Sequence, residues 1–220
     1  MIFIVISSIG IFSLIFMAIF SNLIKRKLSS QETYAVESFL EKAIKDQEMN
    51  TLLRIAPKTK SAYDGMKDII ELRNKNDFET LVEGFHEFGH AVDLYKRNLM
   101  DKFNGAIWGV LFYLFKYSIP LGIFFHSLYI NVELLGIDSL SLEFNVLTFL
   151  FYGMSLLFST LTLKEEIVAS SYALKFMPKV VDLSEDKIHT AKMILAKGLT
   201  SYIFIFIISV TLFIYHLLTF

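Results

Sequence analysis

Four long apolar segments constrain the fold of this chain more than any other feature of its sequence. Residues 1–24, 144–163 and 199–220 carry no charged side chain, and residues 106–135 contain two, Lys116 and Glu133. About 20 consecutive apolar residues are enough for a helix to cross the hydrocarbon core of a bilayer. The composition agrees, because 54% of the residues are hydrophobic and the mean hydropathy is +0.52. The sequence therefore predicts a mainly α-helical, multi-pass membrane protein.

The distribution of basic residues predicts how these segments are oriented. Of the 21 Lys and Arg residues, 14 fall in residues 25–105, 6 fall in residues 164–198 and none falls in the loop 136–143. Basic segments next to membrane helices face the cytoplasm. We therefore expect a protein of the cell (inner) membrane, surrounded by lipid bilayer, with both polar segments in the cytoplasm. The net charge is −1 and the longest basic block is Lys25–Lys27, so nothing predicts a nucleic-acid partner.

A histidine pair in the first polar segment indicates the chemistry. His86, Glu87 and His90 form the pattern H-E-x-x-H. Residues four apart lie one turn apart on one helix face, so the two imidazoles can hold one ion. Two neutral imidazoles suit zinc, and an adjacent carboxylate can accept a proton from a water whose pKa the metal has lowered to about 7. The pattern is that of zinc hydrolases, with His86 and His90 as metal ligands and Glu87 as general base.

The neighbours of the motif are uncharged, as expected for a mostly buried helix: Phe85, Phe88, Gly89, Ala91 and Val92. This disfavours the alternative of two surface histidines that happen to lie one turn apart.

Glu166 is the predicted third ligand. The chain has no cysteine, which leaves histidine and carboxylate ligands. Glu166 lies in a helix predicted over 164–177, ended by Pro178, and leads a face of small residues: Ala169, Ser170 and Ala173. Asp93 is nearer in sequence, but three side chains from consecutive turns of one helix spread over about 10 Å and do not converge on one ion. Asp93 would instead orient His90 or lie in solvent. The alternative for Glu166 is a solvated pair with Glu165.

The remaining polar residues predict helices with one short strand. Asn76 and Glu79 form a capping-box-like pair that would start the motif helix, predicted over Phe78–Phe103. Residues 29–60 have an amphipathic helical pattern that Pro57 breaks.

Between these helices, Ala62–Gly65 predicts a turn, and Ile69–Leu72 predicts a short strand. The strand would be an edge strand that pairs with the substrate backbone, or else a connector that packs its isoleucines on the core.

The sequence resembles a known family, the bacterial membrane-bound putative neutral zinc metallopeptidases, often called YugP-type. The resemblance covers most of the chain and is carried by Tyr63-Asp64, His86-Glu87-x-Gly89-His90-Ala91, two intervening spans, and Glu166-x-x-Ala169-Ser170 followed by Ala173-Leu174. More distantly, it is similar to the HtpX and CAAX prenyl protease group. The resemblance to that group implies an aspartate that supports a zinc-bound histidine, and Ser170 stands at this position. A hydroxyl is a weaker orienting partner than a carboxylate.

Together these patterns predict an integral-membrane zinc endopeptidase with a small, mostly helical, zincin-like cytoplasmic unit. His86, His90 and Glu166 would bind zinc, and a protein or peptide would be the substrate. Tyr63, Tyr172 and His189 are candidates for stabilising the transition state by residue type alone. One alternative is a zinc-binding membrane scaffold or pseudoenzyme without hydrolytic activity. Another is a helical membrane protein without a metal.

Overall fold

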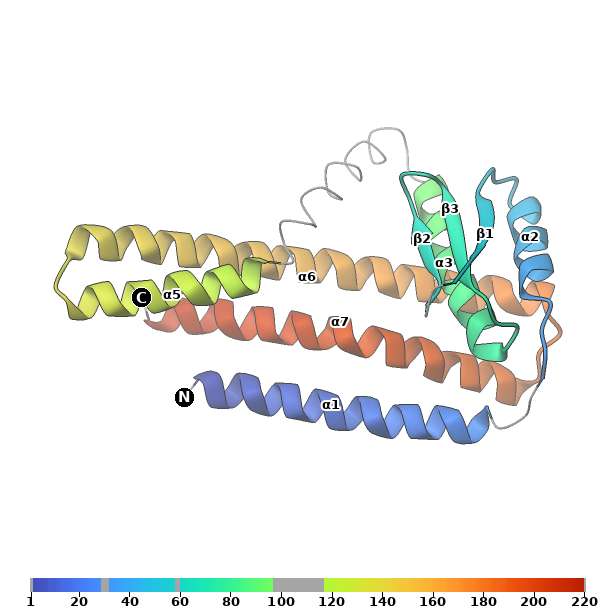
Figure 1. Ribbon diagram of the computed structural model, residues 1–220, viewed down its shortest axis with the longest axis horizontal. Coiled ribbons are helices and arrows are strands. Elements are labelled where there is room, and N and C mark those ends of the chain that lie inside the picture. Colours follow the sequence, from blue (N-terminus) through green and yellow to red (C-terminus); the bar gives the residue numbers. More distant parts are fainter. Residues whose placement is uncertain (1, 29–31, 58–59, 97–116, 220) are drawn as a thin grey trace. The chain divides into compact units, whose positions relative to one another are not determined.

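The computed structural model describes residues 2–28, 32–57, 60–96 and 117–219. Within these ranges the chain forms six helices and three short strands (Figure 1). In chain order they are α1 (Ile2–Lys27), α2 (Val36–Asp46), β1 (Leu52–Ala56), β2 (Ala62–Asp64), β3 (Ile69–Arg73), α3 (Phe78–Lys96), α5 (Ser118–Leu134), α6 (Asp138–Val180) and α7 (Glu185–Thr219). The mainly α-helical class predicted from the sequence is confirmed.

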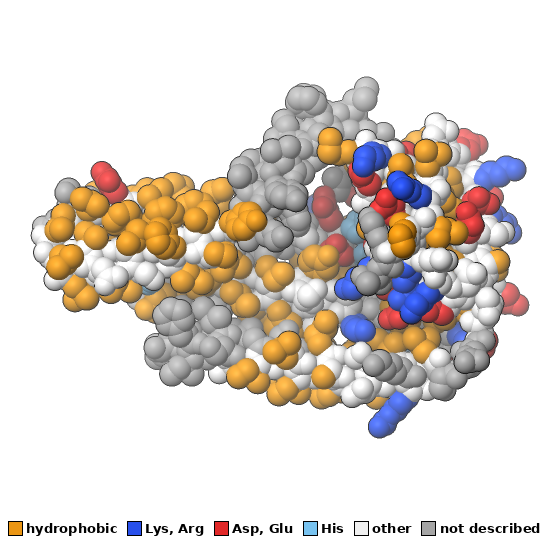
Figure 2. Space-filling view, in the orientation of Figure 1, with side chains coloured by type: hydrophobic (Ala, Val, Ile, Leu, Met, Phe, Trp, Pro, Cys, Tyr) orange, Lys and Arg blue, Asp and Glu red, His pale blue; other side chains and the backbone are white. Residues whose placement is uncertain are grey.

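The chain divides into two compact units, and one of them is apolar. It comprises residues 1–13, 104–163 and 201–220. The side chains visible on its part of α5, α6 and α7 are mostly hydrophobic (Figure 2). Close packing holds α5 to α6, because a Cβ atom added to Gly122 would lie 2.4 Å from the Tyr152 ring.

Two of the described helices are long and apolar enough to cross a membrane, namely Leu140–Val180 and Glu185–Thr219. They contain the span predicted at 144–163 and the described part of the span predicted at 199–220. The described part of the span predicted at 1–24 falls within α1, and the first part of the span predicted at 106–135 lies outside the described residues. The number of membrane passes and their orientation stay predictions.

The second unit comprises residues 14–103 and 164–200 and contains a small sheet. Its strand order is β1-β3-β2, with β1 parallel and β2 antiparallel to β3. The strand predicted at Ile69–Leu72 is present as β3, but it is the central strand. The prediction of an edge strand that pairs with substrate was therefore wrong for this segment, because both of its edges are already paired.

The sequence interpretation missed the other two strands. The helix predicted over 29–60 is limited in the described residues to α2, and β1 follows it. Glu48 adopts a left-handed backbone conformation, with φ of 52°, and the Met49 amide bonds back to the Ile44 carbonyl at 3.2 Å. This turn ends the helix, and the apolar residues after it join the sheet. The turn predicted at Ala62–Gly65 begins with β2 instead.

The motif helix α3 begins at Phe78, so its N-cap is the residue after the predicted cap, Asn76. Its N-cap is Asp77, whose Oδ1 accepts the Thr80 amide at 2.8 Å. The predicted cap, Asn76, instead accepts the Tyr34 amide through its backbone carbonyl. The predicted extension of α3 beyond Lys96 lies outside the described residues.

The buried face of α3 forms the centre of the second unit. The helix packs against β2, β3 and α2 (Figure 1). Its largest fully buried side chains are mostly hydrophobic, namely Leu81, Val82, Phe85, Phe88 and Val92, with Thr80 as the polar member. This burial confirms the expectation that the motif helix is enclosed on most sides.

A single helix, α6, contains both the third predicted span and the predicted ligand helix. The sequence interpretation placed a boundary at Lys164 and an end at Pro178, but α6 runs unbroken from Asp138 to Val180 with Pro178 inside its last turn. At Lys164 and Glu165 the side chains change from apolar to charged, but the backbone hydrogen bonds of the helix do not depend on side-chain polarity. The helix therefore continues through this point.

Candidate metal centre

Three side chains from two helices converge within the second unit. His86 and His90 lie one turn apart on α3, and Glu166 reaches them from α6. The Glu166 carboxylate oxygens lie 3.0 Å from Nε2 of His86 and 3.7 Å from Nε2 of His90. The three candidate ligand atoms all lie within 4.8 Å of one another. Among the described residues, this is the group of histidines and carboxylates that could hold a metal ion, and Asp93 is not part of it.

The two helices approach closely because small residues line the contact. A Cβ atom added to Gly89, on the turn between the two histidines, would lie 2.3 Å from the Ala169 carbonyl oxygen. Ala169 and Ala173 are themselves fully buried. A residue without a Cβ atom allows the backbones to approach at this point. The contact sets the distance at which Glu166 faces the histidines.

Ser170 orients one of the histidines. Its hydroxyl oxygen lies 3.2 Å from Nδ1 of His86, while Nε2 of the same ring faces Glu166. Hydrogen bonding at one ring nitrogen fixes which nitrogen is available to a metal. Burial opposes the charged form of His86, but the hydrogen bond that its ring donates to Glu166 and the nearby carboxylates outweigh burial, so the pKa of His86 is raised.

Glu87 lies beside this group and is largely removed from water. Burial raises the pKa of its carboxyl to about 7, against the attraction of His86 and a hydrogen bond from the Tyr63 backbone amide. A carboxyl with a pKa near neutrality can both accept and donate a proton at physiological pH. Residue type, burial and position therefore fit a general acid-base role.

The three candidates for transition-state stabilisation are not part of the converging group. The Tyr63 hydroxyl donates to Asp68 at 3.0 Å, and burial raises its pKa. The Tyr172 ring lies 4.6 Å from Nζ of Lys96, and His189 is exposed.

The sequence interpretation also missed the role of the β2 backbone, because no side-chain pattern indicates that the Tyr63 amide bonds to Glu87.

The donor set fits zinc. Two imidazole nitrogens and one carboxylate are a common ligand set for catalytic zinc, and ligands 2.0 to 2.2 Å from one tetrahedral ion lie about 3.4 Å apart. The His86 and Glu166 atoms at 3.0 Å are close to that separation. The three side chains are mostly buried but not closed to solvent. The exposed fraction is 17% for His86, 23% for His90 and 13% for Glu166, which leaves access for a water molecule.

Comparison with known proteins adds an independent finding. A family model described as putative neutral zinc metallopeptidase matches residues 2–220, nearly the whole chain. No curated protein and no solved structure gives a significant match. The expected similarity to the HtpX and CAAX prenyl protease group stays an expectation.

Proposed function

Because the chain belongs to the family of putative neutral zinc metallopeptidases, we propose that it is an integral-membrane zinc endopeptidase with a cytoplasmic active site. The observation that carries the proposal is the convergence of His86, His90 and Glu166 beside a buried Glu87. The substrate would be a protein or peptide, and the surrounding lipid bilayer would hold the apolar helices.

Each residue of the site has a defined task in this proposal. His86, His90 and Glu166 hold the metal, and Ser170 keeps the His86 ring in the orientation that presents Nε2. Zinc held by these three residues would lower the pKa of a bound water and would polarise the carbonyl of the scissile bond.

Glu87 moves the proton. Its carboxylate accepts a proton from the attacking water and then delivers it to the nitrogen of the leaving amine. The raised pKa suits both steps, because the ideal pKa of such a group lies near the working pH. The Tyr63 amide keeps the carboxylate from rotating away.

The membrane part of the proposal rests on charge and hydropathy. α6 and α7 are long and apolar enough to cross a bilayer, and 20 of the 21 Lys and Arg residues fall in residues 25–105 and 164–198. The same bias favours a cytoplasmic site, because the metal group lies in these two segments.

The experiment is a comparison of Glu87→Gln with wild type in the purified full chain. We expect about one zinc per chain in both proteins, and hydrolysis of labelled casein by wild type that falls by about 10² to 10⁴-fold in the variant. Glu165→Gln, which removes the exposed carboxylate directly before Glu166 on α6, is the matched control and should keep full activity.

Equal turnover in Glu87→Gln and wild type would refute the assignment of the base. Zinc binding by wild type without hydrolysis would support the scaffold alternative, and wild type without zinc would exclude both.

A further inference from the structure

Glu83 lies one turn before Glu87 on α3, and the proposed mechanism does not use it. Both carboxylates lie close to the backbone of the neighbouring chain segment that contains β2, and this segment packs against α3. Burial raises the pKa of both carboxyls, whereas the backbone of Ser61 lowers the pKa of Glu83 and the backbone of Tyr63 lowers the pKa of Glu87. Two carboxylates four residues apart on a helix therefore lie close to two backbone positions that are two residues apart along an extended segment.

The rise per residue along α3 and along the extended segment explains why both contacts form together. Four residues of an α-helix rise about 6 Å, and two residues of a β-strand rise about 6.6 Å. Amides two residues apart also point to the same side of a strand. In β2, Tyr63 pairs with Ile70 of β3, and its backbone also lies close to Glu87 of α3. The Glu83 contact thus fixes the register in which the Glu87 contact is made.

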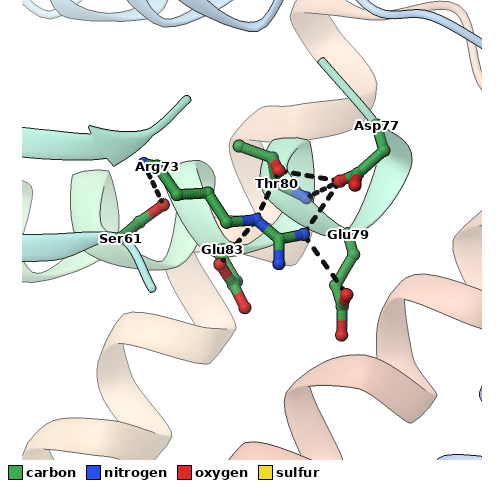
Figure 3. Close-up of polar contacts among 6 residues, drawn as sticks. All are labelled: Ser61, Arg73, Asp77, Glu79, Thr80 and Glu83. Carbon is green, nitrogen blue, oxygen red and sulfur yellow. Dashed lines mark hydrogen bonds and ion pairs between the residues drawn. The ribbon is translucent and has the colours of Figure 1, made fainter. Parts of the chain in front are cut away.

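Arg73 makes an ion pair with Glu83 (Figure 3). It is the last residue of β3, and only 9% of its side chain is exposed. Its Nε atom lies 3.5 Å from Oε2 of Glu83, and its Nη2 atom lies 2.8 Å from Asp77 and 3.2 Å from Glu79. The Ser61 hydroxyl oxygen lies 3.4 Å from the Arg73 amide nitrogen, so Arg73 also contacts the segment that bonds to Glu83.

The charge of Glu83 depends on this arginine. Its Oε2 atom is buried and makes no hydrogen bond to any residue that the structure describes. A buried carboxylate oxygen is costly unless a charge or a donor compensates it. The Arg73 guanidinium supplies the charge, and the nearby backbone of Ser61 also favours the ionised carboxylate.

We propose that Glu83, held by Arg73, is a positioning residue for the peptidase reaction: it fixes β2 against α3 so that the Tyr63 amide keeps the Glu87 carboxylate in place. This inference rests on the proposed function. Glu83 does not touch the metal group in this arrangement and acts through β2.

The test compares Glu83→Ala, Glu83→Gln and Glu79→Gln in the full chain. Glu79 is the matched control, since it is a carboxylate of the same helix that contacts the same arginine. We measure zinc content, kcat and KM on labelled casein, and hydrogen exchange of the peptide covering residues 60–68.

Glu83→Ala should keep about one zinc per chain and a KM within about twofold of wild type, while kcat falls about 10 to 100-fold, as for other residues that orient a site. Exchange in residues 60–68 should rise about tenfold. Glu83→Gln, which keeps an acceptor for the Ser61 amide, should show smaller changes in the same direction, and Glu79→Gln should match wild type.

An unchanged kcat in both Glu83 variants would overturn the inference, whether or not exchange rises. A fall in kcat without faster exchange in residues 60–68 would overturn it too, because β2 would not be the intermediary. If Glu83→Ala does not fold, Glu83→Gln decides between the same outcomes. Failure of the proposed function is distinct, because wild type would then show no hydrolysis at all, and unchanged exchange in the variants would still refute the positioning role.

Discussion

Substitution of Gly89 by alanine is the sharpest test of how the two helices build the metal centre. The new Cβ atom would lie 2.3 Å from the Ala169 carbonyl oxygen and 2.9 Å from its carbonyl carbon and Cα. All three are backbone atoms, so no side chain can rotate to make room. An ordinary contact begins near 3.4 Å, and α3 and α6 must therefore move apart by about 1 Å at this turn.

A displacement of this size is large for a metal site. Ligand distances must stay within about 0.2 Å of their ideal values, so a shift of about 1 Å moves Glu166 out of reach of an ion held by His86 and His90. We expect zinc affinity to fall by about 100-fold or more, measured by competition with a chelator. Overpacking should cost about 1 to 3 kcal/mol of unfolding free energy, which the higher helix propensity of alanine offsets by about 1 kcal/mol.

Gly84→Ala is the matched control on the same helix. Its Cβ atom would lie 2.7 Å from Cδ1 of Leu40 and 3.1 Å from Cδ2 of Leu72, which are the ends of flexible side chains away from α6. This variant should lose stability but bind zinc within about twofold of wild type. Wild-type zinc affinity in Gly89→Ala would refute the conclusion that this close contact sets the geometry of the site.

Other parts of the structure give three further predictions. Glu166→Ala should lose most of the zinc, whereas Asp93→Ala should weaken binding by no more than the 10 to 100-fold typical of residues outside the ligand set, and metal analysis that gave the reverse order would contradict the two-helix site. In intact cells, an impermeant thiol reagent should label Leu135→Cys but not Asn50→Cys, two exposed positions, and the opposite labelling would invert the proposed orientation. Burial opposes ionisation of Asp77, but hydrogen bonds from Thr80 and the nearby Arg73 guanidinium hold its pKa below the usual 3.8. The contribution of Asp77 to stability is therefore present above pH 3.8 and is lost as the pH falls through the lowered pKa. The difference in unfolding free energy between wild type and Asp77→Asn should accordingly shrink in acid, and a pH-independent difference would disprove the assignment.

The parts of the site that depend on helical periodicity could be predicted from the sequence. His86, Glu87 and His90 have their relation fixed by one turn of α3, and Glu166 was identified by the small residues that follow it on one helix face. The close contact between Gly89 and Ala169 agrees with that face packing against the motif helix. Local geometry determines each of these features.

The features that depend on contacts between distant segments could not be predicted. β1 and β2 are short, and each is stabilised by pairing with β3 and not by its own sequence pattern. The bond from the Tyr63 amide to Glu87 involves a backbone group, which every residue carries, so no residue type signals it. The continuity of α6 was missed because a change from apolar to charged side chains was interpreted as the end of a helix.

That continuity limits which insertions α6 can tolerate near the metal centre. Each residue of an α-helix advances the direction of every later side chain by about 100° and its height by about 1.5 Å. Ala169 is held against Gly89, so one residue inserted between Glu166 and Ala169 would turn the carboxylate away from the histidines. Seven inserted residues would nearly restore its direction but displace it by about 10 Å along the helix. The spacing of two residues between Glu166 and Ala169 is therefore as necessary to the site as the carboxylate itself, whereas a loop of the same length could absorb the change.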